Sequence, residues 1–245
     1  MKIAALSDFH IGARAGGDEF RHAEADFLAY LDRLEAGHDR IVLVGDIWQT
    51  EHALLPGRRA AARQLARAQA RVPALARRLR GPQYAYLHGN HDEVAGTELG
   101  ATERLRLAAD GFAAVFIHGH QFDPIFARAY AAARAATWFT GRLRRVGLRP
   151  LAQWFEGRDV ALKHRRFGHA RGPYAAGARA LLREHAADLV VMGHTHVPQL
   201  HALPEGLLVN TGSCSRGRYM HVTIDTAARS VELHAPGVEL SRRSC

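Results

Sequence analysis

Five short apolar runs, each followed at once by polar residues, constrain the fold of this chain more than any other feature. The runs lie at residues 2–6, 41–44, 84–87, 113–117 and 189–192. Because apolar and polar residues do not alternate within them, the runs are typical of strands buried on both faces of a sheet. Helical patterns at 24–34 and 58–79 separate the first three runs, which predicts βαβ units and a largely parallel sheet.

The pattern changes after residue 200. Residues 207–213, 219–225 and 230–234 read as short strands joined by turns, so we expect an antiparallel second half that closes a β-sandwich with helices outside. With 245 residues, 47% of them hydrophobic and 23% charged, the chain is long enough to bury a sizeable core. We therefore expect one α/β domain over residues 1–245 that carries an insertion.

Polar side chains that suit metal ions follow all five apolar runs. Because function in such sheets collects beyond the carboxyl ends of the strands, we expect these side chains to converge. Carboxylates with imidazoles suit Mn, Fe, Zn or Ni, and one carboxylate can bridge two ions. We choose Asp46 as the bridge because it is the only ligand that its strand supplies. The predicted metal ligands are Asp8, His10, Asp46, Asn90, His118, His194 and His196.

Single motifs in this set have structural explanations as well: Asp46 could cap a helix, and Asn90 could serve a turn. The joint occurrence favours a metal centre. Asp8 and His10 are one residue apart, as are His194 and His196, so each pair would point to one side if its strand stays extended.

Two divalent cations in such a centre would clamp a phosphoryl group and acidify a water that attacks phosphorus. The leaving oxygen then needs a proton. His91 lies next to Asn90 and is not needed as a ligand, so we expect it to act as the general acid. The alternative is that His91 only orders its loop by hydrogen bonding. The expected catalytic residues are His91 and Asp46.

Together these motifs resemble the signature of the calcineurin-like metallophosphoesterases. The resemblance is carried by Asp8-x-His10, Gly45-Asp46, Gly89-Asn90-His91-Asp92, His118 and Gly193-His194-Thr195-His196, in that order along residues 1 to about 215. It implies a four-layer αββα sandwich with a dinuclear centre. By that resemblance, one metal is held by Asp8, His10, Asp46 and His196. The other metal is held by Asp46, Asn90, His118 and His194, with His91 as the catalytic imidazole.

The segment after the fourth run does not fit the alternation of strands and helices. Residues 124–155 contain six arginines and no Asp or Glu, and aromatic residues are interleaved with the arginines. We expect an inserted helical cap over residues 124–172. Its basic amphipathic surface would suit an anionic lipid or a ligand with an apolar tail. The alternative is that the aromatic residues pack the cap onto the main domain.

The insertion is similar to that of the UDP-2,3-diacylglucosamine pyrophosphatases, peripheral enzymes of lipid A synthesis. Protein phosphatases of the family carry Asp and Arg where this chain has Gln49 and Thr50, which disfavours that branch. The chain departs from the main pyrophosphatase type at His91 and His120, where that type has Arg and Asp. The resemblance implies manganese-dependent release of UMP and a sugar 1-phosphate. The residues we expect to contact substrate are Asn90, Asp123, Arg128, Lys163 and Arg166.

The net charge of +9 favours an anionic partner. A nuclease or phosphodiesterase acting on nucleic acid or soluble nucleotides is the alternative function, and a metal-bound scaffold without activity is a third. Only Cys214 and Cys245 occur, so no disulfide framework is expected, and no window reaches the ~20 apolar residues of a membrane span. We expect a cytoplasmic protein whose contact with the inner face of the cell membrane is at most peripheral.

Overall fold

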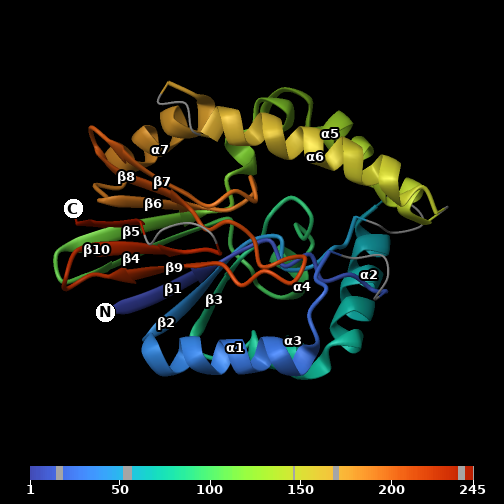
Figure 1. Cartoon of the computed structure of the whole chain (residues 1–245), viewed down its shortest axis with the longest axis horizontal. Coiled ribbons are helices and arrows are strands. Elements are labelled where there is room, and N and C mark those ends of the chain that lie inside the picture. Colours follow the sequence, from blue (N-terminus) through green and yellow to red (C-terminus); the bar gives the residue numbers. More distant parts are fainter. Residues whose placement is uncertain (15–18, 52–56, 146, 168–170, 237–240, 245) are drawn as a thin grey trace.

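Two β-sheets packed face to face form the centre of the molecule (Figure 1). The computed structural model describes residues 1–14, 19–51, 57–145, 147–167, 171–236 and 241–244. The first sheet has the order β11-β10-β9-β1-β2-β3 and the second the order β4-β5-β6-β8-β7. The strands of the first sheet are β1 (Lys2–Leu6), β2 (Arg40–Val44), β3 (Tyr84–Leu87), β9 (His221–Asp225), β10 (Ser230–His234) and β11 (Ser241–Ser244). Those of the second are β4 (Arg104–Ala109), β5 (Phe112–Ile117), β6 (Leu189–Met192), β7 (Gln199–Leu203) and β8 (Gly206–Asn210).

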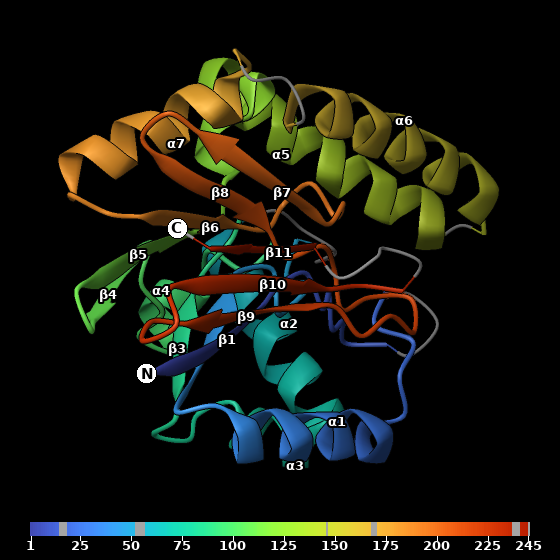
Figure 2. The same cartoon turned by 60° about the vertical axis from the view of Figure 1, so that its left-hand side comes forward.

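Helices cover the outer face of each sheet. Below the first sheet lie α1 (Glu24–Gly37), α2 (Arg58–Arg71) and α3 (Pro73–Arg78), and α7 (Pro173–Glu184) lies on the second (Figures 1 and 2). The single helical stretch expected at 58–79 is two helices, because Pro73 lacks a backbone N–H and begins α3. A short helix, α4 (Ala95–Glu98), follows the third strand.

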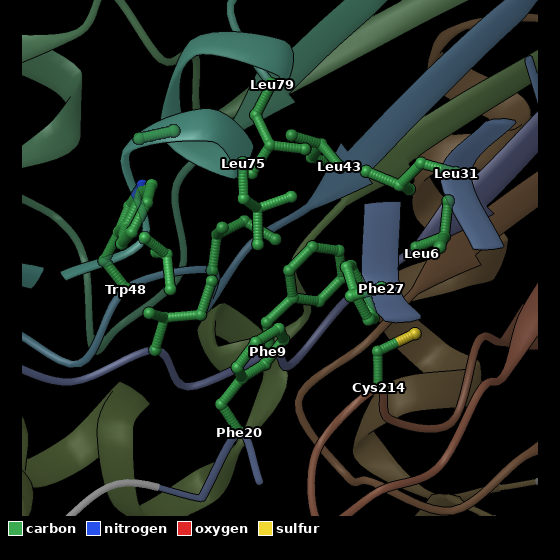
Figure 3. Close-up of a cluster of buried hydrophobic side chains, with 14 of the residues drawn as sticks. Leu6, Phe9, Phe20, Phe27, Leu31, Leu43, Trp48, Leu75, Leu79 and Cys214 are labelled. Atoms are coloured by element: carbon green, nitrogen blue, oxygen red, sulfur yellow. The ribbon is translucent and has the colours of Figure 1, made fainter. Parts of the chain in front are cut away.

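Strand residues alternate between two buried layers, which explains why the apolar runs show no alternation. In β1, Ala4 and Leu6 face the helices below, whereas Ile3 and Ala5 face the second sheet. Figure 3 shows the lower core, where Leu6 lies near side chains such as Phe27. A third cluster joins the second sheet to α7. Three apolar layers between four structural layers confirm the αββα sandwich.

The parallel and antiparallel parts are distributed as the strand patterns indicate. The pairs β1–β2, β2–β3, β5–β6 and β6–β8 are parallel, whereas β9 and β10 pair antiparallel on the other side of β1. The strand β11, at the edge of the first sheet, was not expected from the sequence, and neither were two strands of the second sheet, β4 and β7. Both lie at the edge of the second sheet with partly exposed faces, so neither carries a continuous apolar run.

Two long helices lie between β5 and α7 in the chain. After the short helix η1 (His120–Phe122), α5 (Pro124–Arg145) and α6 (Arg149–Phe167) lie side by side in the layer of α7 (Figures 1 and 2). Both fall within the insertion predicted at 124–172. The helix α5 has a kink at Ala129, whose φ is −144° and ψ 52°. Among the described helices, none is long and apolar enough to cross a bilayer.

Candidate metal centre

Loops at the carboxyl ends of β1, β2, β3, β5 and β6 carry all seven predicted metal ligands. The structure brings six of these side chains together at one edge of the sandwich, as the parallel strand order requires, and Asn90 lies in the loop after β3 at the same edge. Six of them are buried, and His196 is the most accessible, with 26% of its side chain exposed. Their burial means that the polar atoms must find partners within the site.

The backbone at the ligands is left-handed rather than extended. The condition under which Asp8 and His10, or His194 and His196, would share a side of a strand is not met, because β1 ends at Leu6 and β6 at Met192. Asp and His adopt positive φ more readily than most residues, but each such residue still costs about 1–3 kcal/mol. The residues concerned are Asp8 (φ 57°), His10 (53°), Asp46 (55°), His194 (66°) and His196 (60°).

Backbone hydrogen bonds hold two of these loops in register. The N–H of Asp8 donates to the carbonyl of Gly45 at 3.0 Å, and the N–H of His10 donates to the carbonyl of Asp46 at 3.0 Å. The pairing of β1 with β2 thus continues into the site although the strands have ended. The strained residues are therefore fixed by their neighbours rather than by regular strand geometry.

The first group of converging ligand atoms comes from Asp8, His10 and His196. His196 Nε2 lies 3.0 Å from Asp8 Oδ1 and 3.1 Å from His10 Nε2. The Nε2 atom of His10 is also 3.6 Å from Asp8 Oδ1. Two imidazole nitrogens and a carboxylate oxygen that are directed at one another form a suitable part of the coordination sphere of a divalent transition metal.

A second group comes from Asp46, His118 and His194. The Nδ1 atom of His118 lies 2.7 Å from the carbonyl oxygen of Val44, so it donates a proton there and leaves the lone pair on Nε2. That Nε2 atom is 3.2 Å from Asp46 Oδ2. Asp46 also belongs to a third group, with His10 and His91. Its position between the groups fits the bridging role expected for it.

Buried atoms without partners test whether these residues fit metal ions. Within the described part of the chain, Asp8 Oδ1, Asn90 Oδ1 and His118 Nε2 are buried and accept no hydrogen bond. Buried acceptors are rarely left unpaired in proteins. Asp8 and His118 belong to the converging groups, and the donor set lacks cysteine, which fits divalent cations such as Mn, Fe, Zn or Ni.

Three glycines allow the ligand loops to approach each other closely. A Cβ added to Gly89 would lie 2.2 Å from Asp46 Oδ1, and one on Gly45 would lie 2.4 Å from His118 Nδ1. At Gly193 the added atom would lie 2.4 Å from Ser7 Oγ and 2.7 Å from Asp8 Oδ2. The glycines in the sequence motifs are therefore required by packing against the ligands themselves.

The electrostatics of the site favour charged carboxylates. Burial by itself raises the pKa of Asp8 and of Asp46, but the neighbouring histidines outweigh burial and lower both pKa values below the usual range. Burial lowers the pKa of His118, yet the charge of Asp46 overrides it and raises that pKa to about 9. Burial, followed by the charge of Lys163, lowers the pKa of His194 to about 4. Metal binding must displace the proton of a histidine such as His118, whose pKa is raised. The metal affinity will therefore fall in acid.

His91 lies at the edge of this centre with 20% of its side chain exposed. Its backbone N–H donates to Asp46 Oδ1 at 2.8 Å, and its Nε2 lies 3.9 Å from Asp46 Oδ2. The other ring nitrogen, Nδ1, is 2.9 Å from Gln49 Nε2. The ring thus faces the centre through Nε2, which is the atom a general acid would use.

The predicted substrate residues occupy two kinds of position. Asn90 and Asp123 are buried, and Asp123 Oδ2 lies 3.3 Å from His194 Nε2. On α6, Arg166 Nη1 is 3.6 Å from Asp123 Oδ1, and Lys163 is close enough to affect the pKa of His194. Arg128 is exposed on α5. Direct substrate contacts of all five residues stay predictions.

Sequence reasoning missed two residues that organise the site. Asp92 accepts hydrogen bonds from the N–H groups of Asp46, Ile47 and Gly89 at 3.2, 2.7 and 2.6 Å. Gln49, noted only as a departure from the protein phosphatases, contacts two of the histidines. Most of their partners lie 39 to 46 residues away along the chain, so no local pattern indicates these roles.

Two residues whose roles the sequence left open are located by the structure. His120 is buried beside His118, with ring centroids 5.5 Å apart, and burial lowers its pKa to about 2. It belongs to none of the candidate metal groups among the described residues. Cys214 packs in the lower core, where burial raises the pKa of its thiol to about 12, which makes it unsuited to ligation at neutral pH.

The family follows from a direct comparison. A family model described as calcineurin-like phosphoesterase matches residues 1–198, so the chain belongs to the calcineurin-like phosphoesterases. No curated protein matches the chain. Membership, together with the converging ligands, identifies a metal-dependent phosphoester hydrolase.

Solved structures resemble this chain at low sequence identity. A Vps29 from Entamoeba histolytica, complexed with Zn²⁺, has a TM-score of 0.51 and 15% identity over 99% of this chain and 98% of its own. YfcE, a phosphoesterase from E. coli, has a TM-score of 0.49 and 15% identity over 100% and 99%. At such identities the likeness concerns the fold alone.

Proposed function

We propose that the chain hydrolyses the pyrophosphate bond of a lipid-linked nucleotide sugar, UDP-2,3-diacylglucosamine or a close analogue, to UMP and the sugar 1-phosphate. The observation that carries this proposal is the pair α5–α6, which combines exposed apolar side chains with cationic residues close to the metal centre. A soluble nucleotide would require the cationic residues but not the apolar surface.

The cationic residues lie where phosphate oxygens would need them. Lys163 is among the charges that lower the pKa values of His194, His196 and Asp123, which supports a position of its ammonium group near the centre. Arg166 lies beside Asp123, one α6 turn further along. Positive charge at this position would hold the second phosphate of a pyrophosphate while the first occupies the metals.

The apolar surface lies on the same two helices. Phe139 and Trp154 each leave 53% of their surface exposed, and Leu162 is nearly as exposed at 46%. The guanidinium of Arg158 lies 5.1 Å from the Trp154 ring centre, so charge and aromatic surface are combined. Surfaces of this kind bind acyl chains and anionic membranes. We therefore also propose peripheral contact with the inner face of the cell membrane.

Two divalent cations, manganese in this proposal, would supply Lewis acidity to the phosphoryl oxygens and lower the pKa of water when bound. The chain's own residues do the rest. Asp46 would bridge the cations, and its Oδ1 is already oriented by the His91 N–H. His91 would deliver a proton from Nε2 to the leaving oxygen.

A substrate panel tests the proposal. Purified protein with Mn²⁺ is offered UDP-2,3-diacylglucosamine, a cyclic nucleotide, single-stranded DNA and bis-p-nitrophenyl phosphate, and the product of each is followed: UMP, the linear nucleotide, shortened DNA and p-nitrophenolate. We expect the acylated substrate to be preferred and Asp46→Asn to abolish all turnover. Preference for DNA would instead support the nuclease alternative, and metal binding without any hydrolysis would support a scaffold.

Surface variants separate the lipid part of the proposal from the reaction class. Trp154→Ser with Phe139→Ser should raise KM for the acylated substrate about tenfold or more, since each buried aromatic contributes about 1.5–3 kcal/mol. Turnover of bis-p-nitrophenyl phosphate should not change. Tyr219→Ser, an exposed aromatic away from the cap, is the matched control. Equal losses on both substrates would contradict a role of the cap in lipid selectivity.

A further inference from the structure

A pocket of about 320 Å³ lies on the outer face of the first sheet, between its edge strand β3 and the helices α2 and α3. Side chains of all three elements line it, as do residues that follow β2. The volume is at the lower end of the range of about 300–1,000 Å³ that small-molecule sites occupy. None of the seven predicted metal ligands is among the described residues that line the pocket. The pocket is therefore a candidate site for a second, small ligand.

The walls of this pocket are apolar and largely aromatic. Leu43 and Leu79 contribute aliphatic surface, and Trp48, Tyr84 and Tyr86 contribute rings. Both tyrosine hydroxyls already donate to carboxylates outside the pocket, so the two residues offer the pocket their rings rather than their hydroxyls. Aromatic rings pack favourably against other rings, edge to face or offset. A flat aromatic group is the body that these walls suit.

Two N–H donors of the pocket residues have no acceptor. Gln69 Oε1 accepts a hydrogen bond from Arg80 Nη2 at 2.9 Å, and because a guanidinium can only donate, the amide must turn its oxygen to Arg80. The remaining Nε2 of Gln69 is buried and has no partner within the described part of the chain. The indole N–H of Trp48 likewise has no acceptor among the described residues. Unpaired donors in the wall of a pocket favour a ligand that brings an acceptor.

The pocket also carries a positive charge. Arg80 is exposed just after α3, and its bond to Gln69 holds the guanidinium beside the pocket. No carboxylate of the described residues forms an ion pair with Arg80, and the described lining contains neither Asp nor Glu. A planar guanidinium can bind a carboxylate through two parallel hydrogen bonds. The charge therefore favours an anion and disfavours a cation.

We propose that this pocket binds a small aromatic carboxylate. The ring would lie against Trp48, Tyr84 and Tyr86, and the carboxylate would accept hydrogen bonds from Arg80 and from the amide of Gln69. A neutral apolar molecule would leave the donors unpaired, and a sugar would place its hydroxyls against apolar walls. The site goes beyond the proposed function and does not depend on it, because no metal ligand takes part.

The pocket lies behind the loop that carries the bridging candidate Asp46. The backbone N–H of Trp48 and the hydroxyl of Tyr86 both donate to Asp92 Oδ2, whereas Asp92 Oδ1 accepts the N–H of Asp46 at 3.2 Å. The carboxylate of Asp92 thus lies between the pocket and the metal centre. No described residue belongs both to the pocket lining and to the candidate metal groups. The two sites can therefore be filled and tested separately.

Fluorine NMR with para-fluorobenzoate tests the site. The protein is loaded with Zn²⁺, which is diamagnetic, and kept in an excess of inorganic phosphate, which competes with the probe for the metal centre. We expect saturable binding of one probe per chain. Ala76→Leu enlarges a side chain of the pocket wall and should weaken binding about tenfold or more. Ala74→Leu, the same change at an exposed position of α3, should leave binding unchanged.

A neutral analogue tests the role of charge. Arg80→Gln should weaken binding of para-fluorobenzoate about tenfold, the effect of losing one charge-assisted hydrogen bond. Binding of para-fluorobenzamide, which has no charge, should change much less. Arg77→Gln removes the same charge from an exposed position of α3 outside the pocket and is the matched control. Equal losses in the two variants, or equal losses for the two probes, would overturn the assignment to a carboxylate.

The fluorescence of Trp48 locates the probe. In a Trp138→Phe/Trp154→Phe background Trp48 is the single tryptophan, and its emission should change with the same saturation as the NMR signal. Unchanged emission, or no saturable binding to the wild type, would overturn the inference. Displacement of the probe by more phosphate would also overturn it, because the probe would then lie at the metals. Thermal unfolding identifies an Ala76→Leu protein that has lost its fold, and Arg80→Gln then decides in its place.

Discussion

Asp123 Oδ2 lies 3.3 Å from His194 Nε2, and this contact joins the helical insertion to the metal centre. The other oxygen, Oδ1, accepts the N–H of Ile125 at 2.9 Å, so Asp123 caps the first turn of α5. The hydroxyl of Tyr174, on α7, donates to Oδ2 at 3.3 Å. A single buried carboxylate thus connects two helices of the upper layer to one predicted ligand.

Asp123→Asn should weaken metal binding. A carboxylate that accepts the proton of His194 Nε2 orients the ring and raises the basicity of the nitrogen left for the metal, and removing such a partner typically costs about 10–100-fold in affinity. Isothermal titration with Mn²⁺ measures the change. Tyr174→Phe removes only the neutral bond to the same oxygen and should cost far less. Identical affinities in wild type and Asp123→Asn would show that the contact has no part in binding metal.

Gly89→Ala should remove metal from the centre. The new Cβ would lie 2.2 Å from Asp46 Oδ1, so the carboxylate would have to leave the position between the two ligand groups. Metal content after dialysis, by plasma mass spectrometry, should fall well below that of the wild type. Gly157→Ala is the control, because nothing lies within 4 Å of its added Cβ in α6. It should stabilise the protein by about 0.5–1 kcal/mol. Full metal content in Gly89→Ala would be inconsistent with the packing described here.

Asp92→Ala should destabilise the fold itself. The carboxylate accepts N–H groups from Asp46, Ile47, Trp48 and Gly89, all of which would lose their partner in a buried place. Leaving such donors unpaired costs about 1–3 kcal/mol each, so we expect at least about 3 kcal/mol in the free energy of unfolding. Urea denaturation measures it. Tyr86→Phe, which removes only the hydroxyl donor to Asp92, should cost about 1 kcal/mol. Similar midpoints for the two variants would argue against this role.

Acid should destabilise the protein through His221, which lies on β9 and belongs to none of the candidate metal groups among the described residues. Burial, and then the charges of His234 and His38, lower the pKa of His221 to about 3. The ring stacks on His234 at 4.2 Å and its Nδ1 lies 2.9 Å from the Tyr30 hydroxyl. Between pH 6.5 and about 3 the unfolded chain binds a proton here that the folded chain does not, so stability falls as the pH falls.

The size of that effect follows from linkage. From pH 7 to pH 5 the loss should be about 1–2 kcal/mol in the free energy of unfolding, because the unfolded imidazole gains its proton near pH 6.5. Denaturant unfolding of wild type and His221→Gln at both pH values provides the test. The variant should lose about that much less on acidification. An equal loss in both proteins would assign the acid sensitivity to other groups.

Much of the fold was predictable because a strand that is buried on both faces appears in the sequence as an unbroken apolar run. Residues 41–44 form an unbroken apolar run, and the structure places Ile41 and Leu43 against helices and Val42 and Val44 against the other sheet. The edge strands β4 and β7 have no unbroken apolar run, because one face of each strand is partly exposed. They acquire strand structure only by pairing with β5 and β8.

The candidate site was predictable in its residue types but not in its geometry. Asp8, His10 and His196 could be chosen because each follows a strand and few other residues bind metals. The left-handed backbone at these positions was not predictable, because it results from hydrogen bonds to loops distant in sequence, such as that from the Asp8 N–H to Gly45.

The sequence alone determined three things: the layered architecture, the sheet edge at which the metal-binding side chains collect, and the class of chemistry. All three depend on local residue type and on strand direction. Only the tertiary structure decided which donor faces which. Gln49 meets His10 and His91, and Asp92 meets the backbone after β2, across separations of 39 to 46 residues. Hydrogen bonds depend on direction and on distances of tenths of an ångström, and these are set by how the loops pack rather than by any spacing along the chain.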